Sequence, residues 1–324
     1  MAKQTPADLW LDDPAAEETH AEFQASVLRG LTNPRKTLEC KYFYDERGSE
    51  LFDAICRQPE YYPTRVETGI LERHAGEIAG LVGPGAELVE LGSGASLKTR
   101  ILLRALERPA RYVPVDISAD YMHSAATALA LEFPGLAVRP VIADFTAPFQ
   151  LPRRTAGRPR LLFFPGSTIG NFHPADAARF LATTCLGLAA DGLLIGVDLK
   201  KDPAVLDAAY NDNSGVTAAF NLNLLERINR DLGASFDLAA FEHRAAYVER
   251  RGRVEMHLRS VLDQTVRVAG RDIDFAAGET IHTENSYKYS IEEFRDLAAR
   301  SRWRLNHTWC DDQARFSVHL LKPA

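Results

Sequence analysis

Short apolar runs alternate with helical patterns between about residues 66 and 201 of the chain. The runs are rich in β-branched, aromatic and aliphatic residues, which is typical of buried strands, and the segments between them carry apolar residues at the three-to-four spacing of helices. This alternation predicts an α/β fold in which helices cover both faces of a parallel sheet. The predicted strands lie within 86–94, 111–118, 136–145, 158–171 and 192–200, and the predicted helices within 95–106, 118–133 and 174–190.

The pattern changes after Pro203. A helical stretch over 207–232 precedes four strand-like runs that predict an antiparallel meander, at 245–250, 253–261, 265–270 and 271–275. A further helix is predicted over 291–303, and the alternation in 304–312 and 314–323 predicts an antiparallel pair that returns to the edge of the first sheet. The chain therefore predicts two domains, one α/β and one α+β.

Composition narrows the classes of protein that fit this pattern. The 324 residues are 46% hydrophobic, enough for a substantial core, and carry a net charge of −6 with scattered Lys and Arg. A nucleic-acid binder needs a basic stripe to neutralise phosphates, so we expect no nucleic-acid partner. The acidic N-terminus lacks the features of a signal peptide, and the apolar runs are far shorter than the roughly 20 residues that cross a bilayer. We therefore expect a cytoplasmic protein with no membrane partner.

The cysteine and histidine spacings do not indicate a metal site. The four cysteines lie far apart with no CxxC pair, so neither a zinc site nor a disulfide framework is predicted. The nine histidines form no HxxxH-type pair, and we expect most of them to be surface or structural residues. No long heptad pattern or isolated apolar helix demands a partner chain, so a monomer is the expectation.

A glycine-rich turn follows the first predicted strand. Gly92, Ser93 and Gly94 stand where the chain must turn into a helix and let a ligand approach the backbone, which glycine permits because it lacks a Cβ atom. The third glycine of a dinucleotide-binding motif would fall at position 97, where this chain has Leu97. A bound pyrophosphate is therefore disfavoured, and with it an NAD-dependent oxidoreductase. A smaller nucleoside without phosphates fits the turn better.

Two further strand ends carry residues that suit a nucleoside. Asp116 stands 22 residues after Gly94, at the end of the second strand, where a carboxylate accepts hydrogen bonds from both ribose hydroxyls. Asp144 and Phe145 end the third strand and suit the edge and the face of an adenine. Ligands of open α/β sheets bind beyond the carboxyl ends of the strands, so these strand ends predict one adenosyl ligand. In the alternative interpretation, Asp116 is a helix N-cap and Asp144 is a turn residue.

Five longer blocks extend the interpretation to nearly the whole chain. They are YFYDERGSELFDAICRQPEYYPTR, ELVELGSGASLKTR, FFPGSTIGNF, YNDNSGVTAAFNLNLLERIN and TENSYKYS. In sequence and order, these blocks resemble the histidine N-α-methyltransferases of ergothioneine biosynthesis. The resemblance implies a Rossmann-like class I methyltransferase domain that binds S-adenosylmethionine (SAM), here 66–201 and 288–324, and a substrate-binding domain, here 15–65 and 202–287. It also implies conversion of L-histidine to the trimethylated betaine hercynine by three methyl transfers.

The resemblance assigns roles to individual residues near the cofactor. It implies that Gly92 contacts SAM through its backbone and that Lys98 lies near the methionyl end. Asp116, Asp144 and Phe145 match the family's ribose and adenine contacts, as the strand ends predict independently. The structural alternative for Lys98 is a solvated helix residue.

For the amino acid, the resemblance implies that Tyr61 and Asn171 hold the imidazole and backbone groups and that Tyr210 holds the carboxylate. It implies an imidazole pocket with an apolar wall, formed by Glu284, Ser286 and Met256. The alternatives are a turn-forming role for Asn171, a half-buried aromatic role for Tyr61, and an exposed ion pair for Glu284.

Methyl transfer from a sulfonium is a direct displacement, which needs alignment of the reactants rather than a metal or a covalent intermediate. Holding the reactants in near-attack geometry contributes about 7–11 kcal/mol. The amine has to lose its proton first, and the resemblance makes Tyr44 the candidate catalytic residue that accepts or relays it. Tyr44 as an ordinary half-buried aromatic is the alternative. Two rival functions are the same chemistry on another aromatic amino acid or amine, and a non-catalytic SAM-binding module.

Overall fold

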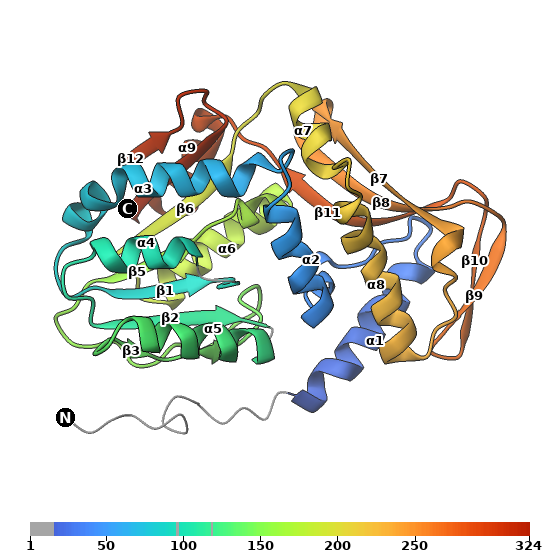
Figure 1. Cartoon of the computed structure of the whole chain (residues 1–324), viewed down its shortest axis with the longest axis horizontal. Helices are drawn as coiled ribbons and strands as arrows, with labels where there is room; N and C mark the ends of the chain where they lie inside the picture. The colour runs from blue at the N-terminus through green and yellow to red at the C-terminus, as the bar shows by residue number, and fades with distance from the viewer. Residues whose placement is uncertain (1–15, 95–96, 118) are drawn as a thin grey trace. The chain divides into compact units, whose positions relative to one another are not determined.

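The computed structural model describes residues 16–94, 97–117 and 119–324 (Figure 1). The contacts between residues divide the chain into two compact units. The first unit contains the described residues of 63–200 and 288–324, and the second those of 16–62 and 201–287. Each unit is therefore assembled from segments that lie far apart in the sequence.

The first unit is built on one eight-stranded sheet (Figure 1). Its strands are β1 (Glu87–Leu91), β2 (Arg111–Asp116), β3 (Ala137–Val138), β4 (Val141–Ile142), β5 (Arg160–Phe164), β6 (Gly192–Asp198), β12 (Trp303–Cys310) and β13 (Phe316–Pro323). Their order is β12-β13-β6-β5-β1-β2-β3, and β4 also pairs with β2. The pairs from β6 to β3 are parallel, whereas β13 is antiparallel to both β6 and β12. The predicted parallel sheet and the predicted return of the C-terminal pair to its edge are both confirmed.

Helices flank this sheet. They are α3 (Tyr62–Val82), α4 (Leu97–Ala105), α5 (Ala119–Glu132), α6 (Pro174–Gly187) and α9 (Ile291–Arg300). Crossover connections between parallel strands are right-handed. The connections through α4 (β1 to β2) and α5 (β2 to β3) run toward one edge of the sheet, whereas the connection through α6 (β5 to β6) runs toward the other edge. α4 and α5 therefore cover one face of the sheet, and α6 covers the opposite face. The start of α9 is marked in the sequence, because Ser290 and Glu293 form a capping box.

The central strands are buried along their whole length. Every residue of β1, β5 and β6 is buried, because helices cover both faces of a parallel sheet. The buried Glu87 of β1 is paired, with Arg160 of β5 at 3.1 Å and with Arg111 of β2 at 2.6 Å. This pairing offsets the cost of burying the charges.

The second unit combines helices with two antiparallel sheets (Figure 1). One sheet has the order β11-β8-β7, from β7 (Phe241–Val248), β8 (Arg253–Ser260) and β11 (Thr280–Tyr287). The other is a hairpin of β9 (Gln264–Val268) and β10 (Arg271–Phe275). The helices are α1 (Ala16–Thr32), α2 (Glu46–Cys56), α7 (Pro203–Tyr210) and α8 (Val216–Leu232), with short 3-10 helices at η2 (Cys40–Phe43), η4 (Leu238–Ala240) and η5 (Glu249–Arg251). α8 packs against α2, β7 and β8.

Two predictions for this unit are wrong in detail. The four predicted strands do not form one meander. They pair antiparallel as two hairpins, β7-β8 and β9-β10, and β11, for which no strand was predicted, lies beside β8. The helix predicted over 207–232 is interrupted at 211–215. Gly215 there has a φ of +70°, and Asp212 accepts the backbone N–H groups of Val216 and Thr217 at 2.8 and 2.7 Å. These contacts start a new helix.

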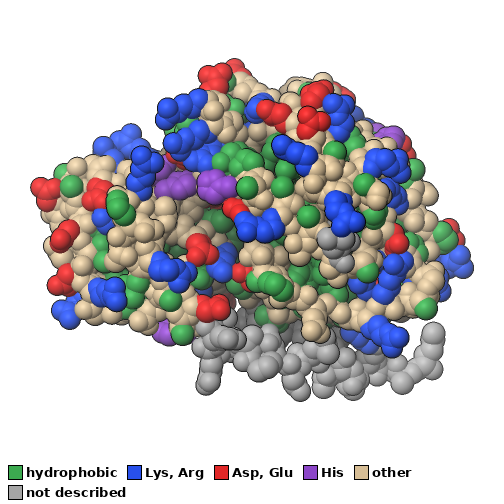
Figure 2. All heavy atoms as spheres, turned by 180° about the vertical axis from the view of Figure 1, so that it is seen from behind, with side chains coloured by type: hydrophobic (Ala, Val, Ile, Leu, Met, Phe, Trp, Pro, Cys, Tyr) green, Lys and Arg blue, Asp and Glu red, His purple; other side chains and the backbone are tan. Residues whose placement is uncertain are grey.

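Helix composition and surface charge relate to the predictions about membrane and nucleic-acid partners. Over 16–94, 97–117 and 119–324, each helix is too short or too polar to span a membrane. On the face shown in Figure 2, Lys and Arg side chains are interspersed with Asp and Glu side chains. The charges that are scattered along the sequence are thus also mixed on this surface.

Candidate active site

The carboxyl ends of β1 and β2 carry the residues of the predicted glycine turn and its acidic neighbour. Beyond β1, Gly92 has a φ of +75° and Gly94 a φ of +43°, a conformation that L side chains rarely adopt. The backbone N–H of Gly94 donates to Asp116 Oδ2, at the end of β2, over 3.4 Å. Ala95 and Ser96 of the turn lie outside the described residues. Gly92, Gly94 and Asp116 are thus brought together at one edge of the sheet.

Asp144 and Phe145 follow β4 at the same edge. A Cβ atom on Gly92 would lie 3.5 Å from the Phe145 ring, so this ring covers the glycine turn. The ring also packs edge-on against Phe164 at the end of β5, with centroids 5.6 Å apart. Asp144 Oδ1 accepts the backbone N–H and the hydroxyl of Thr146 at 2.8 and 2.5 Å. Asp144 therefore does form the turn of the alternative interpretation, and that turn orients its carboxylate beside Phe145.

A buried carboxylate joins the start of α4 to the loop after β5. Glu67 of α3 is fully buried and forms an ion pair with Lys98 of α4. The same carboxylate accepts the backbone N–H of Gly166 at 2.9 and 3.1 Å. A Cβ atom on Gly196 of β6 would lie 2.0 Å from Glu67 Oε1, so only glycine leaves room for this carboxylate. Lys98 is held by an acidic partner, and the alternative of a solvated helix residue is wrong.

The loop after β5 has an unusual backbone conformation. Ser167 has a φ of +58°, which is uncommon for a residue other than glycine. Its Oγ accepts the backbone N–H of Asp198 at 2.9 Å, and the Asp198 carboxylate pairs with the buried Lys288 at 2.7 Å. The half-buried Asn171 ends the following 3-10 helix η3 (Thr168–Asn171). A strained residue that surrounding bonds hold in place is typical of ligand-binding loops.

In the second unit, Tyr44 lies in an aromatic cluster. Its half-buried ring packs edge-on against Phe52 of α2 and Phe220 of α8, with centroids 5.7 and 5.8 Å apart. The adjacent Asp45 caps α2 by accepting the N–H of Gly48 at 2.7 Å, and it accepts two hydrogen bonds from side chains of α8. A Cβ atom on Gly48 would lie 1.7 Å from a backbone carbonyl oxygen. The DERGS motif therefore fixes the chain next to Tyr44.

Tyr61 and Tyr210 extend this cluster. Both are buried and pack edge-on with centroids 6.3 Å apart, and Phe52 contacts Tyr61 in the same way at 6.3 Å. The Tyr210 hydroxyl donates to Ser286 Oγ at 2.7 Å. Burial raises the pKa of Tyr61 well above its usual value, and the nearby Tyr210 adds to this, so the Tyr61 phenol stays neutral. Contacts thus connect Tyr44, Tyr61, Tyr210 and Ser286 into one group.

A β-bulge in β11 determines which side chains join this group. The register pairs Glu284 with Met256 of β8 and skips Thr283. Directly paired residues share a face of the sheet, and so do alternate residues along a strand, so Glu284, Met256 and Ser286 lie on one face. Without the bulge, Thr283 would pair with Met256, and Glu284 would turn to the opposite face. Glu284 is half-buried on this face, and Met256 is buried.

Asn221 of α8 holds the bulge in place. It is fully buried, donates from Nδ2 to the carbonyl of His257 at 3.0 Å, and accepts the Thr283 hydroxyl at 2.8 Å. Its Nδ2 also lies 2.9 Å from His243 Nδ1, and His243 Nε2 lies 2.9 Å from the Tyr210 carbonyl oxygen. Burial lowers the pKa of His243, so a neutral ring donates to that carbonyl and accepts from Asn221. One network thus supports both Tyr210 and the bulge.

The comparisons with known proteins assign the chain to a family. Residues 23–323 match the family described as "Histidine-specific methyltransferase, SAM-dependent". The chain belongs to this family. The histidine N-alpha-methyltransferases of Mycolicibacterium smegmatis and Mycobacterium tuberculosis are 45% and 44% identical to it, over 94% and 93% of this chain and 96% and 95% of their own. Ergothioneine biosynthesis protein 1 of Neurospora crassa is 30% identical over 91% of this chain, which spans 34% of that relative.

The turn after β1 of this methyltransferase fits the cofactor of its family. A Cβ atom built on Gly94 would have no neighbour within 4 Å among the described residues, so the backbone there is open to a ligand. Around this opening stand the Asp116 carboxylate and the Phe145 ring. A carboxylate acceptor suits a ribose diol, and a ring suits the face of an adenine. The residues present therefore fit SAM.

Three residues that organise the methyltransferase were not predicted from its sequence. Asp45 had a usable signal, because an Asp directly before a helical pattern is a typical N-cap. Glu67 and Asn221 are polar residues on buried faces of α3 and α8. A polar residue within the apolar stripe of a helix was the only signal available for them.

Proposed function

We propose that this methyltransferase transfers three methyl groups in succession from SAM to the α-amino group of L-histidine, which forms hercynine for ergothioneine biosynthesis. One observation carries the proposal: Glu284 and Ser286 share a face of the β11-β8 sheet, beside the buried Tyr210. A neutral imidazole has one N–H donor and one acceptor nitrogen, which a carboxylate and a hydroxyl satisfy together. The family match and the two mycobacterial relatives support histidine as the acceptor.

When bound, SAM supplies an electrophilic methyl group on a sulfonium. We assign its ribose to Asp116, its adenine to Asp144 and Phe145, and its methionyl end to Lys98. The Gly92 turn offers backbone groups at the same edge of the sheet. The buried ion pair of Lys98 restricts the direction of its ammonium group, which lowers the entropy that is lost when a ligand binds.

We assign the groups of the amino acid to individual side chains. Tyr61 and Asn171 hold the imidazole and backbone groups, Tyr210 holds the carboxylate, and Met256 forms an apolar wall. The neutral Tyr61 phenol is a hydrogen-bond donor at physiological pH. Fixed donors of this kind hold the substrate in a near-attack geometry, which contributes about 7–11 kcal/mol to a displacement that needs no covalent intermediate.

Tyr44 is the candidate to accept or relay the proton of the ammonium group. Low polarity and a nearby sulfonium charge disfavour a second cation, so the amine loses its proton more readily in the site than in water. Aromatic faces attract quaternary ammonium groups. The rings of Tyr44, Phe52 and Phe220 therefore tolerate the positive charge that becomes permanent at the third methyl transfer.

The test of this function is a competition among acceptors. The purified full chain is incubated with SAM and an equimolar mixture of the twenty amino acids, and mass spectrometry follows the products. We expect a gain of three methyl groups on histidine alone. A gain on another amino acid would show that the acceptor was assigned wrongly, and no gain despite measured SAM binding would support the non-catalytic module instead.

Glu284→Gln tests the imidazole pocket. Loss of a charged hydrogen-bond partner costs about 1.5–3 kcal/mol, so kcat/KM for histidine should fall roughly 10- to 100-fold while SAM affinity is unchanged. The exposed Glu292→Gln on α9 is the matched control and should retain wild-type kinetics. Wild-type kinetics for histidine in Glu284→Gln would contradict the assignment.

Tyr44→Phe tests the proton transfer. We expect kcat to fall and its pH dependence to change, because the ring packing is kept and only the hydroxyl is lost. Unchanged turnover across the pH range would remove Tyr44 from the mechanism.

We further propose a cytoplasmic monomer without a nucleic-acid partner. Analytical ultracentrifugation of the purified chain tests the monomer, and fractionation of the producing cells tests the location. A dimer or a membrane-bound pool would contradict the respective prediction.

A further inference from the structure

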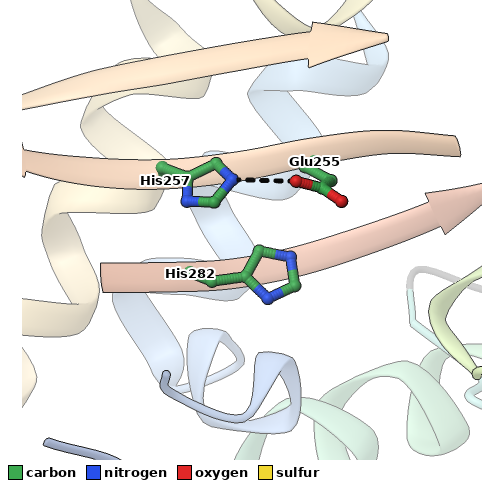
Figure 3. Close-up of side chains that lie close together, drawn as sticks. All are labelled: Glu255, His257 and His282. Atoms are coloured by element: carbon green, nitrogen blue, oxygen red, sulfur yellow. Dashed lines mark hydrogen bonds and ion pairs between the residues drawn. The ribbon is translucent and has the colours of Figure 1, made fainter. Parts of the chain in front are cut away.

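Glu255, His257 and His282 form a cluster on the second unit's β11-β8 sheet, on the face opposite Met256 and Glu284 (Figure 3). Glu255 and His257 are alternate residues of β8, and His282 of β11 is the direct partner of His257. One ligand atom from each lies within 4.8 Å of the others. Figure 3 shows the His282 ring directed toward the two residues of β8. The cluster therefore gathers three metal-binding side chains from two strands.

The three side chains belong to the types that bind transition-metal ions. A histidine offers an imidazole nitrogen and a glutamate offers a carboxylate oxygen, and metal ions bind neutral imidazoles and charged carboxylates.

Each imidazole ring of the cluster has one buried nitrogen without a hydrogen-bond partner in the described part of the chain. His282 Nε2 and His257 Nδ1 are buried, and neither has a hydrogen-bond partner among the described residues. Arg251 and Arg253 bind Glu255 Oε1, at 2.8 Å for Arg251 and at 2.5 and 2.9 Å for Arg253. The other oxygen, Oε2, lies 3.3 Å from His257 Nε2. A buried nitrogen without a partner is costly, and an ion bound at His282 Nε2 would remove that cost.

The spacing and the donor set point to one class of ion. In a tetrahedral zinc site with bonds of about 2.0–2.1 Å, neighbouring ligand atoms lie about 3.3 Å apart. Glu255 Oε2 and His257 Nε2 have this separation, and one ligand atom from each of the three side chains lies within 4.8 Å of the others. Two histidines and one carboxylate bind zinc in known sites and leave a fourth position for water. We propose that Glu255, His257 and His282 bind a divalent transition-metal ion such as Zn²⁺, which clamps β8 to β11.

The surroundings set the expected strength and effect of this site. The guanidinium groups of Arg251 and Arg253 oppose a dication, so we expect micromolar affinity, weaker than a site of four thiolates. His282 lies next to the bulge that directs Glu284. An ion bound to both strands would therefore restrain the register at that bulge, and it would raise the melting temperature by binding only the folded chain.

The experiment uses the full chain without an affinity tag, stripped with a chelator and then titrated with Zn²⁺ against a chromogenic chelator. We expect one ion per chain, a higher Tm with Zn²⁺, and, with Co²⁺ in place of Zn²⁺, visible absorption typical of low coordination number. Loss of a residue that only hydrogen-bonds to a metal ligand weakens binding by about 10- to 100-fold. His257→Gln and His282→Gln remove ligands themselves, so each should weaken Zn²⁺ binding by more than this. The exposed His20→Gln on α1 is the matched control and should bind as wild type.

Several outcomes would overturn the site. Wild-type protein that takes up no Zn²⁺ at micromolar concentration excludes it. Equal uptake by wild type, His257→Gln and His282→Gln places the ion elsewhere. If a cluster variant fails to fold, the Co²⁺ spectrum of wild type and of Glu255→Gln decides the question, and a spectrum of octahedral aqueous Co²⁺ in wild type refutes the proposal.

Discussion

Glu67→Gln tests whether one buried carboxylate organises the cofactor half of the enzyme. Glu67 is fully buried, whereas the side chain of its partner Lys98 is 15% exposed. The carboxylate also accepts the backbone N–H of Gly166, which fixes the loop after β5. Gln retains the shape and one acceptor oxygen, but it removes the negative charge and turns an NH₂ group toward a donor.

The expected magnitude follows from the burial of the two partners. Removing one partner of a buried ion pair costs about 3–5 kcal/mol, and a hydrogen bond to a charged group contributes about 1.5–3 kcal/mol. Lys98 keeps a route to solvent, so we expect Glu67→Gln to lose about 2–3 kcal/mol of unfolding free energy. SAM affinity should fall at least about 10-fold, equivalent to about 1.4 kcal/mol, because Lys98 and the Gly166 loop lose their common anchor.

Urea denaturation and calorimetric titration with SAM measure these two quantities. Glu72→Gln, exposed on the same helix, is the matched control and should change neither. Lys98→Met completes a double-mutant cycle, in which contacting residues give a coupling of about 0.5–3 kcal/mol. If Glu67→Gln unfolds within about 0.5 kcal/mol of wild type and binds SAM equally well, the anchoring role is refuted.

Three further predictions concern other buried positions. Gly48→Ala should lower Tm and the unfolding free energy, the latter by about 1–3 kcal/mol, because its Cβ atom would lie 1.7 Å from a carbonyl oxygen. Gly76→Ala, on the exposed side of α3, is the control and should raise the unfolding free energy by roughly 0.5–1 kcal/mol. Burial raises the pKa of Glu90 from 4.5 to about 7, so Glu90 contributes stability below about pH 4.5 that is lost as the pH rises to 7. Between these pH values, the unfolding free energy of the wild type should fall by up to about 3 kcal/mol because of Glu90, and Glu90→Gln should lack this fall. Urea denaturation at several pH values measures it, and the same pH profile in wild type and variant would contradict the prediction. Asn221→Ala should lower the unfolding free energy by about 1–3 kcal/mol, because it removes the hydrogen bond that holds the bulge of β11. In steady-state assays, it should raise KM for histidine more than KM for SAM. Equal effects on both KM values would argue against this role of Asn221.

Much of the first unit could be predicted from local patterns. Continuous apolar runs predict β1, β5 and β6, because a strand that is buried on both faces needs apolar residues at successive positions. The Gly92 turn and Asp116 could also be anticipated, because parallel strands end at one edge of their sheet and convert sequence order into spatial proximity. The third glycine of a dinucleotide-binding motif allows close packing of helix and strand. Leu97 stands at that position with an exposed side chain, so no glycine is needed there.

The second unit was less predictable. Its site residues were proposed from a resemblance to a family, and the structure connects Tyr44, Tyr61, Tyr210 and Ser286 through contacts that no local spacing encodes. The helix break at 211–215 carried a glycine and an aspartate that local rules recognise. The weak alternation of β11 follows from its bulge, which interrupts the period of two on which strand prediction rests.

The sequence by itself determined which segments are buried, where the backbone needs glycine after β1, and which family's motifs the chain carries. Only the tertiary structure decided that Glu67 meets Lys98, that Glu284 faces Met256, and that His282 faces His257. The physical reason is that local periodicity reports burial along one element, whereas the direction of a side chain across a sheet depends on strand register, and a shift of one residue reverses it. Register is set by pairing between segments that lie far apart in the chain, so it becomes defined only when the chain folds.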